Sequence, residues 1–192
     1  GWDFVNGDND PDDDNSDPYG SYHGTHVAGI IGAVGGNATG VVGVNWTVSL
    51  MALKILDDRG NGTVAEEIEA IDYAISNGAH IINASFSGDQ FSQIEYEAIA
   101  DAGAAGILFV AAAGNGGDDN AGSGWNNDGA GHDVYPASYA LSNIVAVGAS
   151  DQDDLLADFS NYGSTSVDVT APGVNIYSTE SGDTYDYKGG TS

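Results

Sequence analysis

A formal charge of −26 on a chain of 192 residues, from 29 acidic and only three basic side chains, excludes nucleic-acid binding, because no basic patch can form to meet phosphate. No apolar run reaches the roughly 18 residues that cross a bilayer, and the absence of cysteine excludes disulfides, thiol catalysis and cysteine-bound zinc. With 41% hydrophobic residues, the chain is expected to form one acidic domain that contacts neither nucleic acid nor membrane.

The first half of the chain is predicted to fold as loop, helix, strand and helix. An acidic loop over 1–22 precedes a helix that begins near His23, where apolar residues recur at helical spacing along one face. A mostly apolar run over 49–56 is typical of a buried parallel strand. Thr63 and Glu66 have the spacing of a capping box, so a second helix is expected to begin there.

The second half continues this alternation. The apolar runs and turn residues predict a strand over 80–85, a helix over 93–105, and strands over 107–113, 144–149 and 167–171. The sequence does not decide whether the peptide bond before Pro136 is cis. Alternating strands and helices predict an α/β fold built on a mostly parallel sheet.

Three polar residues lie where functional groups gather in such sheets, which is at the carboxyl ends of strands. His23 opens a helix, Asn115 follows a predicted strand, and Ser192 ends a Gly-Gly-Thr-Ser turn. Taken singly, the three residues are better explained as a surface histidine, a turn asparagine and a frayed chain end. Each residue alone is therefore weak evidence for a site.

Taken together, the three motifs resemble those of the subtilisin-like serine proteases, or subtilases. The motifs are, in chain order, His23-Gly24-Thr25-His26-Val27-Ala28-Gly29, Ala112-Ala113-Gly114-Asn115 and Gly190-Thr191-Ser192. Further family-like segments lie between them, at 40–44, 83–88, 144–149 and 171–174. The resemblance implies a three-layer α/β/α fold with a mostly parallel central sheet.

The resemblance covers residues 1–192 as one partial peptidase domain, truncated at both ends. It implies that the strand bearing the family's catalytic aspartate and the helix after the nucleophile lie outside the chain. None of the aspartates from Asp3 to Asp17 follows an apolar strand, so none is nominated for that role. The chain as given is accordingly expected to be inactive by itself.

The resemblance implies a serine endopeptidase with an acyl-enzyme intermediate. Ser192 would be the nucleophile, His23 the general base, and the side-chain amide of Asn115 a donor to the oxyanion. His26 would only pack in the core. The enzyme is expected to be a secreted, extracellular monomer that acts on protein or peptide substrates, with a propeptide inhibitor as a further partner.

The substrate is expected to bind as an extended strand, through main-chain hydrogen bonds and side-chain pockets. The residues predicted to contact it are Gly62, Thr63 and Val64 on one side, Ser85, Phe86 and Ser87 on the other, and Gly114 and Val134 in the pocket for the residue before the cut. Small lining residues favour a large hydrophobic side chain there. The prediction for Thr63 conflicts with the capping box unless the helix begins a residue or two later.

Two loops are candidates for structural Ca²⁺, which prefers hard oxygen ligands. The first supplies the carboxylates of Asp3, Asp8, Asp10 and Asp12, although a merely solvated acidic loop explains them equally well. The resemblance of Trp2-Asp3-Phe4-Val5 to family members with calcium in this loop favours Asp3 and Asp8. For the second loop, the resemblance implies the Asn37 side chain and the carbonyls of Gly35, Thr39 and Val41.

The sequence leaves two alternative functions besides a peptidase. A non-catalytic binding module with a subtilase fold is disfavoured because His23, Asn115 and Ser192 are all intact. An acidic calcium-binding structural or adhesive domain would explain the charge, but it would not explain three ordered motifs.

Overall fold

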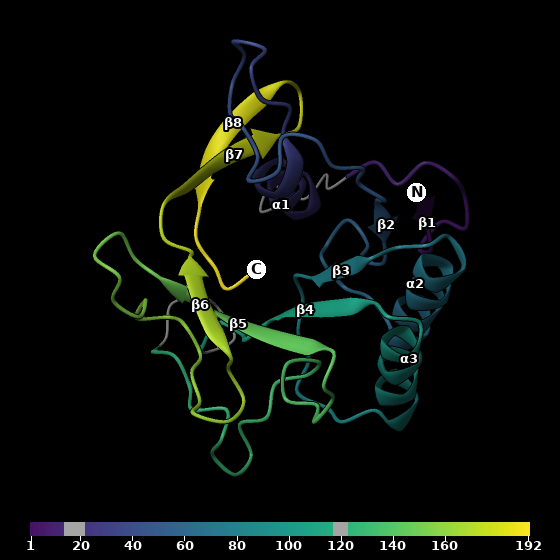
Figure 1. Cartoon of the computed structure of the whole chain (residues 1–192), viewed down its shortest axis with the longest axis vertical. Helices are drawn as coiled ribbons and strands as arrows, with labels where there is room; N and C mark the ends of the chain where they lie inside the picture. Colours follow the sequence, from purple (N-terminus) through teal and green to yellow (C-terminus); the bar gives the residue numbers. More distant parts are fainter. Residues whose placement is uncertain (14–21, 117–122) are drawn as a thin grey trace. The chain divides into compact units, whose positions relative to one another are not determined.

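The computed structural model of the protein describes residues 1–13, 22–116 and 123–192. Asp14 and Asp17 of the acidic loop, and the stretch just after Gly116, lie outside the described residues. The chain divides into two compact units, one of Gly1–Ala74 with Tyr177–Tyr187 and one of Ile75–Ile176 with Lys188–Ser192, and each is described by itself (Figure 1). Among the helices in the described residues, none is both long and apolar enough to cross a bilayer.

The first unit contains the helix that opens with His23. This helix, α1, spans His23–Gly32, close to the range that the apolar spacing predicted. Strand β1, Trp2–Asp3, pairs in parallel with β2, Leu53–Lys54. Strands β7, Ile176–Glu180, and β8, Thr184–Lys188, form a second small sheet that the sequence reasoning did not predict.

Helix α2, Val64–Ser76, begins at the predicted capping box. The Thr63 N–H donates to Glu66 Oε2 at 2.7 Å, and the Glu66 N–H donates to Thr63 Oγ1 at 3.3 Å. These reciprocal bonds satisfy two N–H groups at the start of the helix. Gly78 follows the helix with a φ of +73°, as expected of a terminating glycine.

The strand predicted over 49–56 is much shorter in the structure, where only Leu53–Lys54 is extended and paired. Val48 and Leu50 before it are 43% and 47% exposed. Among the described residues, β2 pairs only with the two-residue strand β1. The rest of the predicted strand over 49–56 therefore has no strand partner there.

The second unit is built on a four-stranded sheet in the order β3-β4-β5-β6, with every neighbouring pair parallel. The strands span Ile81–Ala84, Leu108–Ala112, Ile144–Ser150 and Val169–Pro172, close to their predicted ranges. Helix α3, Gln93–Ala104, packs against β4. The mostly parallel α/β fold predicted from the sequence is thus confirmed.

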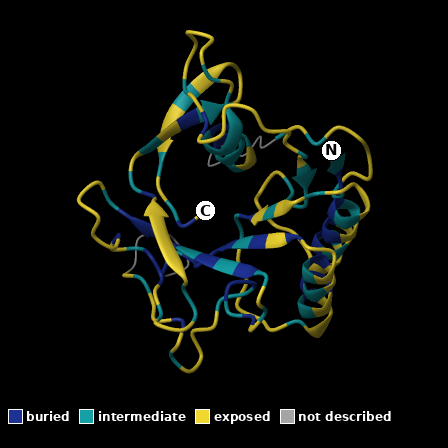
Figure 2. Ribbon diagram, in the orientation of Figure 1, coloured by how far each residue is buried: buried dark blue, intermediate teal, exposed yellow. Residues whose placement is uncertain are grey.

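The core of the second unit is made largely of small side chains. Phe109 of β4 and Ile99 of α3 are fully buried, and alanines fill most of the space around them (dark blue in Figure 2). Small residues allow the sheet and the helix to approach closely. The Tyr135–Pro136 peptide bond, which the sequence left undecided, is cis.

Candidate active site

The candidate site lies at the carboxyl ends of β3 and β4. Ser85 follows β3 directly, and Asn115 lies just beyond the end of β4. The last residues of the chain reach the same place, because the Gly190 N–H donates to the Gly173 carbonyl at 2.9 Å beyond the end of β6. Parallel strands therefore bring Ser85, Asn115 and Ser192 to one edge of the sheet.

The Asn115 side chain is oriented by the backbone of Thr191. The Thr191 N–H donates to Asn115 Oδ1 at 2.9 Å, and Thr191 Oγ1 accepts the Gly114 N–H at 3.1 Å. Since Oδ1 is the acceptor in this bond, the Nδ2 group is left as a donor, and it makes no hydrogen bond to the described residues. The amide is thus oriented with Nδ2 left to donate to another group.

Ser192 is exposed, and its hydroxyl has one weak contact within the second unit. Its Oγ lies 3.4 Å from the Ser85 carbonyl, long for an O–H···O bond. Gly190 lies against the Asn115 amide, because a Cβ built on it would be 3.6 Å from Asn115 Nδ2. The nucleophile predicted from the sequence and the predicted oxyanion donor are therefore neighbours.

His23 lies in the first unit, as the half-buried first residue of α1. His26, one turn along, is 3% exposed, and its Nε2 lies 3.1 Å from the Asp186 carbonyl, so it packs as expected. Gly29 allows α1 to approach β7 closely, because a Cβ there would overlap Ser178 and Thr179. The approach of His23 to Asn115 and Ser192 stays a prediction.

The residues predicted to form the specificity pocket come together in the second unit. Gly88 and Tyr135 exchange two backbone hydrogen bonds, of 2.8 and 2.9 Å, which join the segment after Ser85 to the segment containing Val134. Gly114 has a φ of +99°, and a Cβ on it would lie 3.2 Å from Val134 Cγ1. Glycine is therefore favoured at this turn, which lies against Val134.

The two predicted substrate-binding segments differ in the structure. The backbone groups of Phe86 and Ser87 make no hydrogen bond to the described residues, so they can pair with an extended peptide. The backbone of Thr63 is engaged at the start of α2, because its N–H is bonded to Glu66 and its carbonyl accepts the Glu67 N–H at 3.2 Å. Gly62 and Thr63 precede α2, and Val64 is its first residue; substrate binding by these three residues stays a prediction.

In the first predicted calcium loop, Asp3 is bonded by groups of the protein itself. Asp3 is 1% exposed, and its carboxylate accepts hydrogen bonds from the Val5 N–H, the Asn6 N–H and the Asn6 side chain at 2.8–2.9 Å. The Lys54 ammonium completes the set at 3.1 Å, which places a cation against this carboxylate.

The remaining aspartates of that loop are engaged locally or exposed. Asp8 Oδ1 accepts the Asp10 N–H at 2.9 Å, and Asp12 Oδ1 accepts the Asp13 N–H at 3.0 Å. In the described parts of the chain, no three acidic or histidine side chains are grouped so as to hold a metal ion. The ligand set predicted from Asp3, Asp8, Asp10 and Asp12 is therefore not assembled.

The second predicted calcium loop is a series of exposed turns. Asn37 Oδ1 accepts the Thr39 N–H at 3.0 Å, and Gly36 and Gly40 have φ values of +74° and +57°. The carbonyls of Gly35, Thr39 and Val41 accept no hydrogen bond from the described residues. Free carbonyl oxygens on a tight turn suit Ca²⁺, so this donor set fits the ion.

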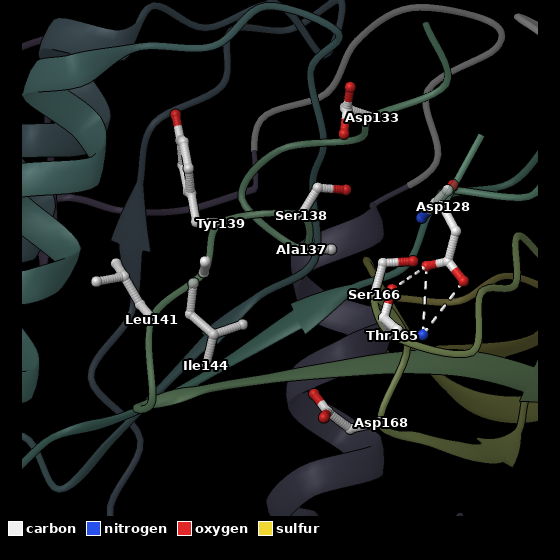
Figure 3. A pocket seen from close by; sticks show the side chains of 12 residues that line it. Asp128, Asp133, Ala137, Ser138, Tyr139, Leu141, Ile144, Thr165, Ser166 and Asp168 are labelled. Atoms are coloured by element: carbon white, nitrogen blue, oxygen red, sulfur yellow. Dashed lines mark hydrogen bonds between the residues drawn. The ribbon is translucent and has the colours of Figure 1, made fainter. Parts of the chain in front are cut away.

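A hollow of about 550 Å³ in the second unit lies apart from the predicted residues (Figure 3). Neither Asn115 nor Ser192 lines it. At its edge the Asp128 carboxylate accepts bonds of 2.7–3.3 Å from the backbone and hydroxyl groups of Ser164 and Thr165. The Thr165 hydroxyl, followed by the hydroxyls of Ser166 and Ser164, holds the pKa of Asp128 well below its usual range. The ionised Asp128 carboxylate thus joins its own loop to the loop that contains Ser164 and Thr165.

Sequence reasoning missed four residues around the site: Thr191, Asn161, Asn127 and Asp128. Asn161 is 2% exposed and uses its N–H to bond the Gly114 carbonyl at 2.9 Å. Asn127 is also 2% exposed and reaches the end of β4. In the sequence both look like ordinary turn residues, and only their burial distinguishes them.

Comparison with known proteins places this sequence in a family. The model of the subtilase family matches residues 1–192. A thermophilic serine proteinase of Bacillus sp. strain AK1 is 44% identical over 192 residues, which is 100% of this chain and 43% of that protein. Thermitase of Thermoactinomyces vulgaris is 40% identical over 192 residues, covering 100% of this chain and 61% of thermitase.

A third relative gives the same result. Subtilisin Savinase of Lederbergia lenta is 42% identical over 173 residues, or 90% of this chain and 58% of that protein. The chain thus spans about half the length of the curated relatives it matches, from 43% to 61% in these three. Its three motifs, its parallel sheet and its full-length match to the family model agree, and the chain belongs to the subtilase family.

Proposed function

We propose that this chain carries the nucleophile, the general base and an oxyanion donor of a serine endopeptidase. The observation that carries the proposal is the bond from the Thr191 N–H to Asn115 Oδ1, which leaves Nδ2 as a donor near the turn that ends in Ser192. Unlike the local bonds of Asn37 and Asn126, this bond joins Asn115 to a residue 76 positions away, next to Ser192. Family membership supports the same chemistry.

In the proposed reaction, Ser192 Oγ attacks the carbonyl carbon of the scissile bond while His23 accepts the hydroxyl proton. The carbonyl oxygen becomes an oxyanion that accepts hydrogen bonds from Asn115 Nδ2 and the Ser192 N–H. The C–N bond then breaks as His23 returns the proton to the leaving amine. Water, deprotonated by His23, hydrolyses the acyl ester and regenerates the serine.

The proposed substrate is an extended peptide with a large hydrophobic residue before the cut. Phe86 and Ser87 offer unpaired backbone groups for a substrate strand, and Gly114 and Val134 border the pocket. Secretion, a monomeric state and inhibition by a propeptide belong to the same proposal.

Labelling with a fluorophosphonate tests the proposed function in the full-length protein. The probe is expected to attach to Ser192, and the labelling rate should fall by orders of magnitude in His23→Ala because the serine is no longer deprotonated. Ser192→Ala serves as the blank, and His26→Asn as a histidine control outside the chemistry. A folded protein that stays unlabelled would indicate a binding module instead of a peptidase.

We also propose that the loop containing Asn37 binds a structural Ca²⁺. At a calcium concentration about 100 times Kd, binding to the folded state alone would stabilise it by about 2.7 kcal/mol. The melting temperature of the full-length protein is therefore expected to fall when a chelator is added. Asn37→Ala should reduce that response, whereas Asp8→Asn should keep it. An Asn37→Ala variant with the full response to chelator would exclude this loop.

A further inference from the structure

The buried carbonyl of Ala113 is bonded by a side chain instead of by a strand. Ladder pairing of β4 with β5 ends at Ala112, and the Ala113 N–H makes one last bond, to the Val147 carbonyl at 2.9 Å. Ala113 is fully buried, so its carbonyl must find a partner inside the protein. That partner is Asn127, whose Nδ2 donates to the carbonyl at 2.8 Å.

The side chain of Asn127 makes this contact although its other polar atom is buried without a partner among the described residues. The residue is 2% exposed, and its Oδ1 has no hydrogen-bond partner in the part of the chain that the structure describes. Exchanging the two amide ends would place Oδ1 against another carbonyl oxygen, so the Ala113 carbonyl fixes the orientation. A buried amide oxygen without a partner is destabilising, so the structure keeps Asn127 buried at a cost in stability while its Nδ2 bonds the Ala113 carbonyl.

The loop that carries Asn127 is held in place by hydrogen bonds on both sides of this residue. On one side of Asn127, the Tyr162 N–H donates to the Trp125 carbonyl at 2.9 Å, and the Asn127 N–H donates to the Tyr162 carbonyl at 2.7 Å. On the other side, Asp128 is bonded to Ser164 and Thr165. These contacts hold the backbone of Asn127 on both sides of the residue.

The Ala113 carbonyl belongs to the segment that carries Asn115, the proposed oxyanion donor. Ala113, Gly114 and Asn115 are consecutive, and the N–H and the carbonyl of Gly114 are both hydrogen-bonded, to Thr191 Oγ1 and the Asn161 N–H, so this turn has little freedom to absorb a shift. A shift of the Ala113 carbonyl would therefore be transmitted to the Asn115 side chain. Misplacement of a reacting group by about 1 Å can lower a rate 10²-fold.

We propose that Asn127 is a positioning residue for the oxyanion donor Asn115, an inference that rests on the proposed peptidase function. The Asn127 amide holds the Ala113 carbonyl, which in turn sets the place of Asn115 Nδ2. Asn127 itself does not touch the reacting atoms in this scheme. Its effect on turnover must accordingly pass through Asn115.

A double-mutant cycle in the full-length protein tests this route. Asn127→Ala is expected to lower kcat roughly 10- to 100-fold on a peptide substrate, with KM changed less than about twofold. In an Asn115→Ala background, Asn127→Ala should lower kcat little further, because the donor that it positions is gone. Asn126→Ala is the matched control, since the exposed Asn126 side chain bonds only the Asp128 N–H next to it, at 3.0 Å. The inference would be overturned if Asn127→Ala lowered kcat by the same factor in the Asn115→Ala background as in wild type. It would also be overturned if Asn127→Ala changed only KM.

Hydrogen exchange separates this inference from the proposed function, because it needs no activity. In Asn127→Ala the amides of Gly114 and Gly116 are expected to exchange faster, while exchange in the core strands is unchanged. If the alanine variant is poorly folded, Asn127→Ser is used with the same readouts, and an intermediate loss is expected. Normal exchange at Gly114 and Gly116 in a folded variant would contradict the positioning role, even in a protein that fluorophosphonate does not label.

Discussion

Replacement of Asn115 by alanine in the full-length protein is expected to lower kcat by about 10²- to 10³-fold, the magnitude known for loss of an oxyanion donor in this same family. KM should change little, because the donor acts on charge that develops only in the transition state. The structure supplies the reason, since Asn115 Oδ1 is held by the Thr191 N–H and Nδ2 remains the donor. Steady-state kinetics on one peptide substrate measure both constants.

Asn115→Asp is the matched control, because the carboxylate has the same shape and can still accept the Thr191 N–H. It cannot donate a hydrogen bond, and it adds negative charge where the oxyanion would form. Its kcat should therefore fall at least as far as that of the alanine variant, while the melting temperature stays close to wild type. High activity in Asn115→Asp would show that this amide does not donate to the oxyanion.

The central sheet could be predicted because its signals are local. Apolar runs bounded by glycine and polar residues mark β3, β4 and β5 within a few residues of their observed ends. The carboxyl-end rule then places Asn115 and Ser85 at one edge without any knowledge of tertiary contacts. The capping box of Thr63 and Glu66 was predictable for the same reason, since its partners are three residues apart.

The contacts that position the site could not be predicted, because they join residues far apart in the chain. Thr191 and Asn115 are separated by 76 positions, and Trp125 donates its N–H to Asn161, 36 positions away. A propensity or spacing rule has no access to such pairs. Sequence reasoning therefore named the chemical groups of the site but missed the residues that orient them.

The ion pair of Asp3 was not predicted for a similar reason. In sequence, Asp3 belongs to an acidic run that suits calcium, and its partner Lys54 lies 51 positions away. Parallel pairing of β1 with β2 places Asp3 directly opposite Lys54, and their side chains meet at 3.1 Å. The fold thus supplies a cation from the chain itself.

Replacement of Lys54 by methionine is accordingly expected to destabilise the full-length protein by about 3–5 kcal/mol, the usual cost of leaving one charge of a buried pair without its partner. The side chains of Lys54 and Asp3 are only 11% and 2% exposed, so water cannot replace the lost ammonium. Denaturant unfolding at neutral pH measures the loss. Arg59→Met removes the same charge from an exposed position and should stay within about 0.5 kcal/mol of wild type.

The pH dependence of this loss identifies the carboxylate that causes it. Burial raises the pKa of Asp3. The hydrogen bonds from the Asn6 N–H and the Lys54 ammonium together lower this pKa by more than burial raises it, so the pKa lies below its ordinary value. The stabilisation is therefore present above the pKa of the unfolded chain and is lost as pH falls through the lowered pKa of the folded state. Without Lys54 the folded-state pKa rises, so the gap between wild type and Lys54→Met should be largest near neutral pH and shrink on acidification. A gap that is independent of pH, or that added calcium closes, would mean that the ammonium is not the counter-ion of Asp3.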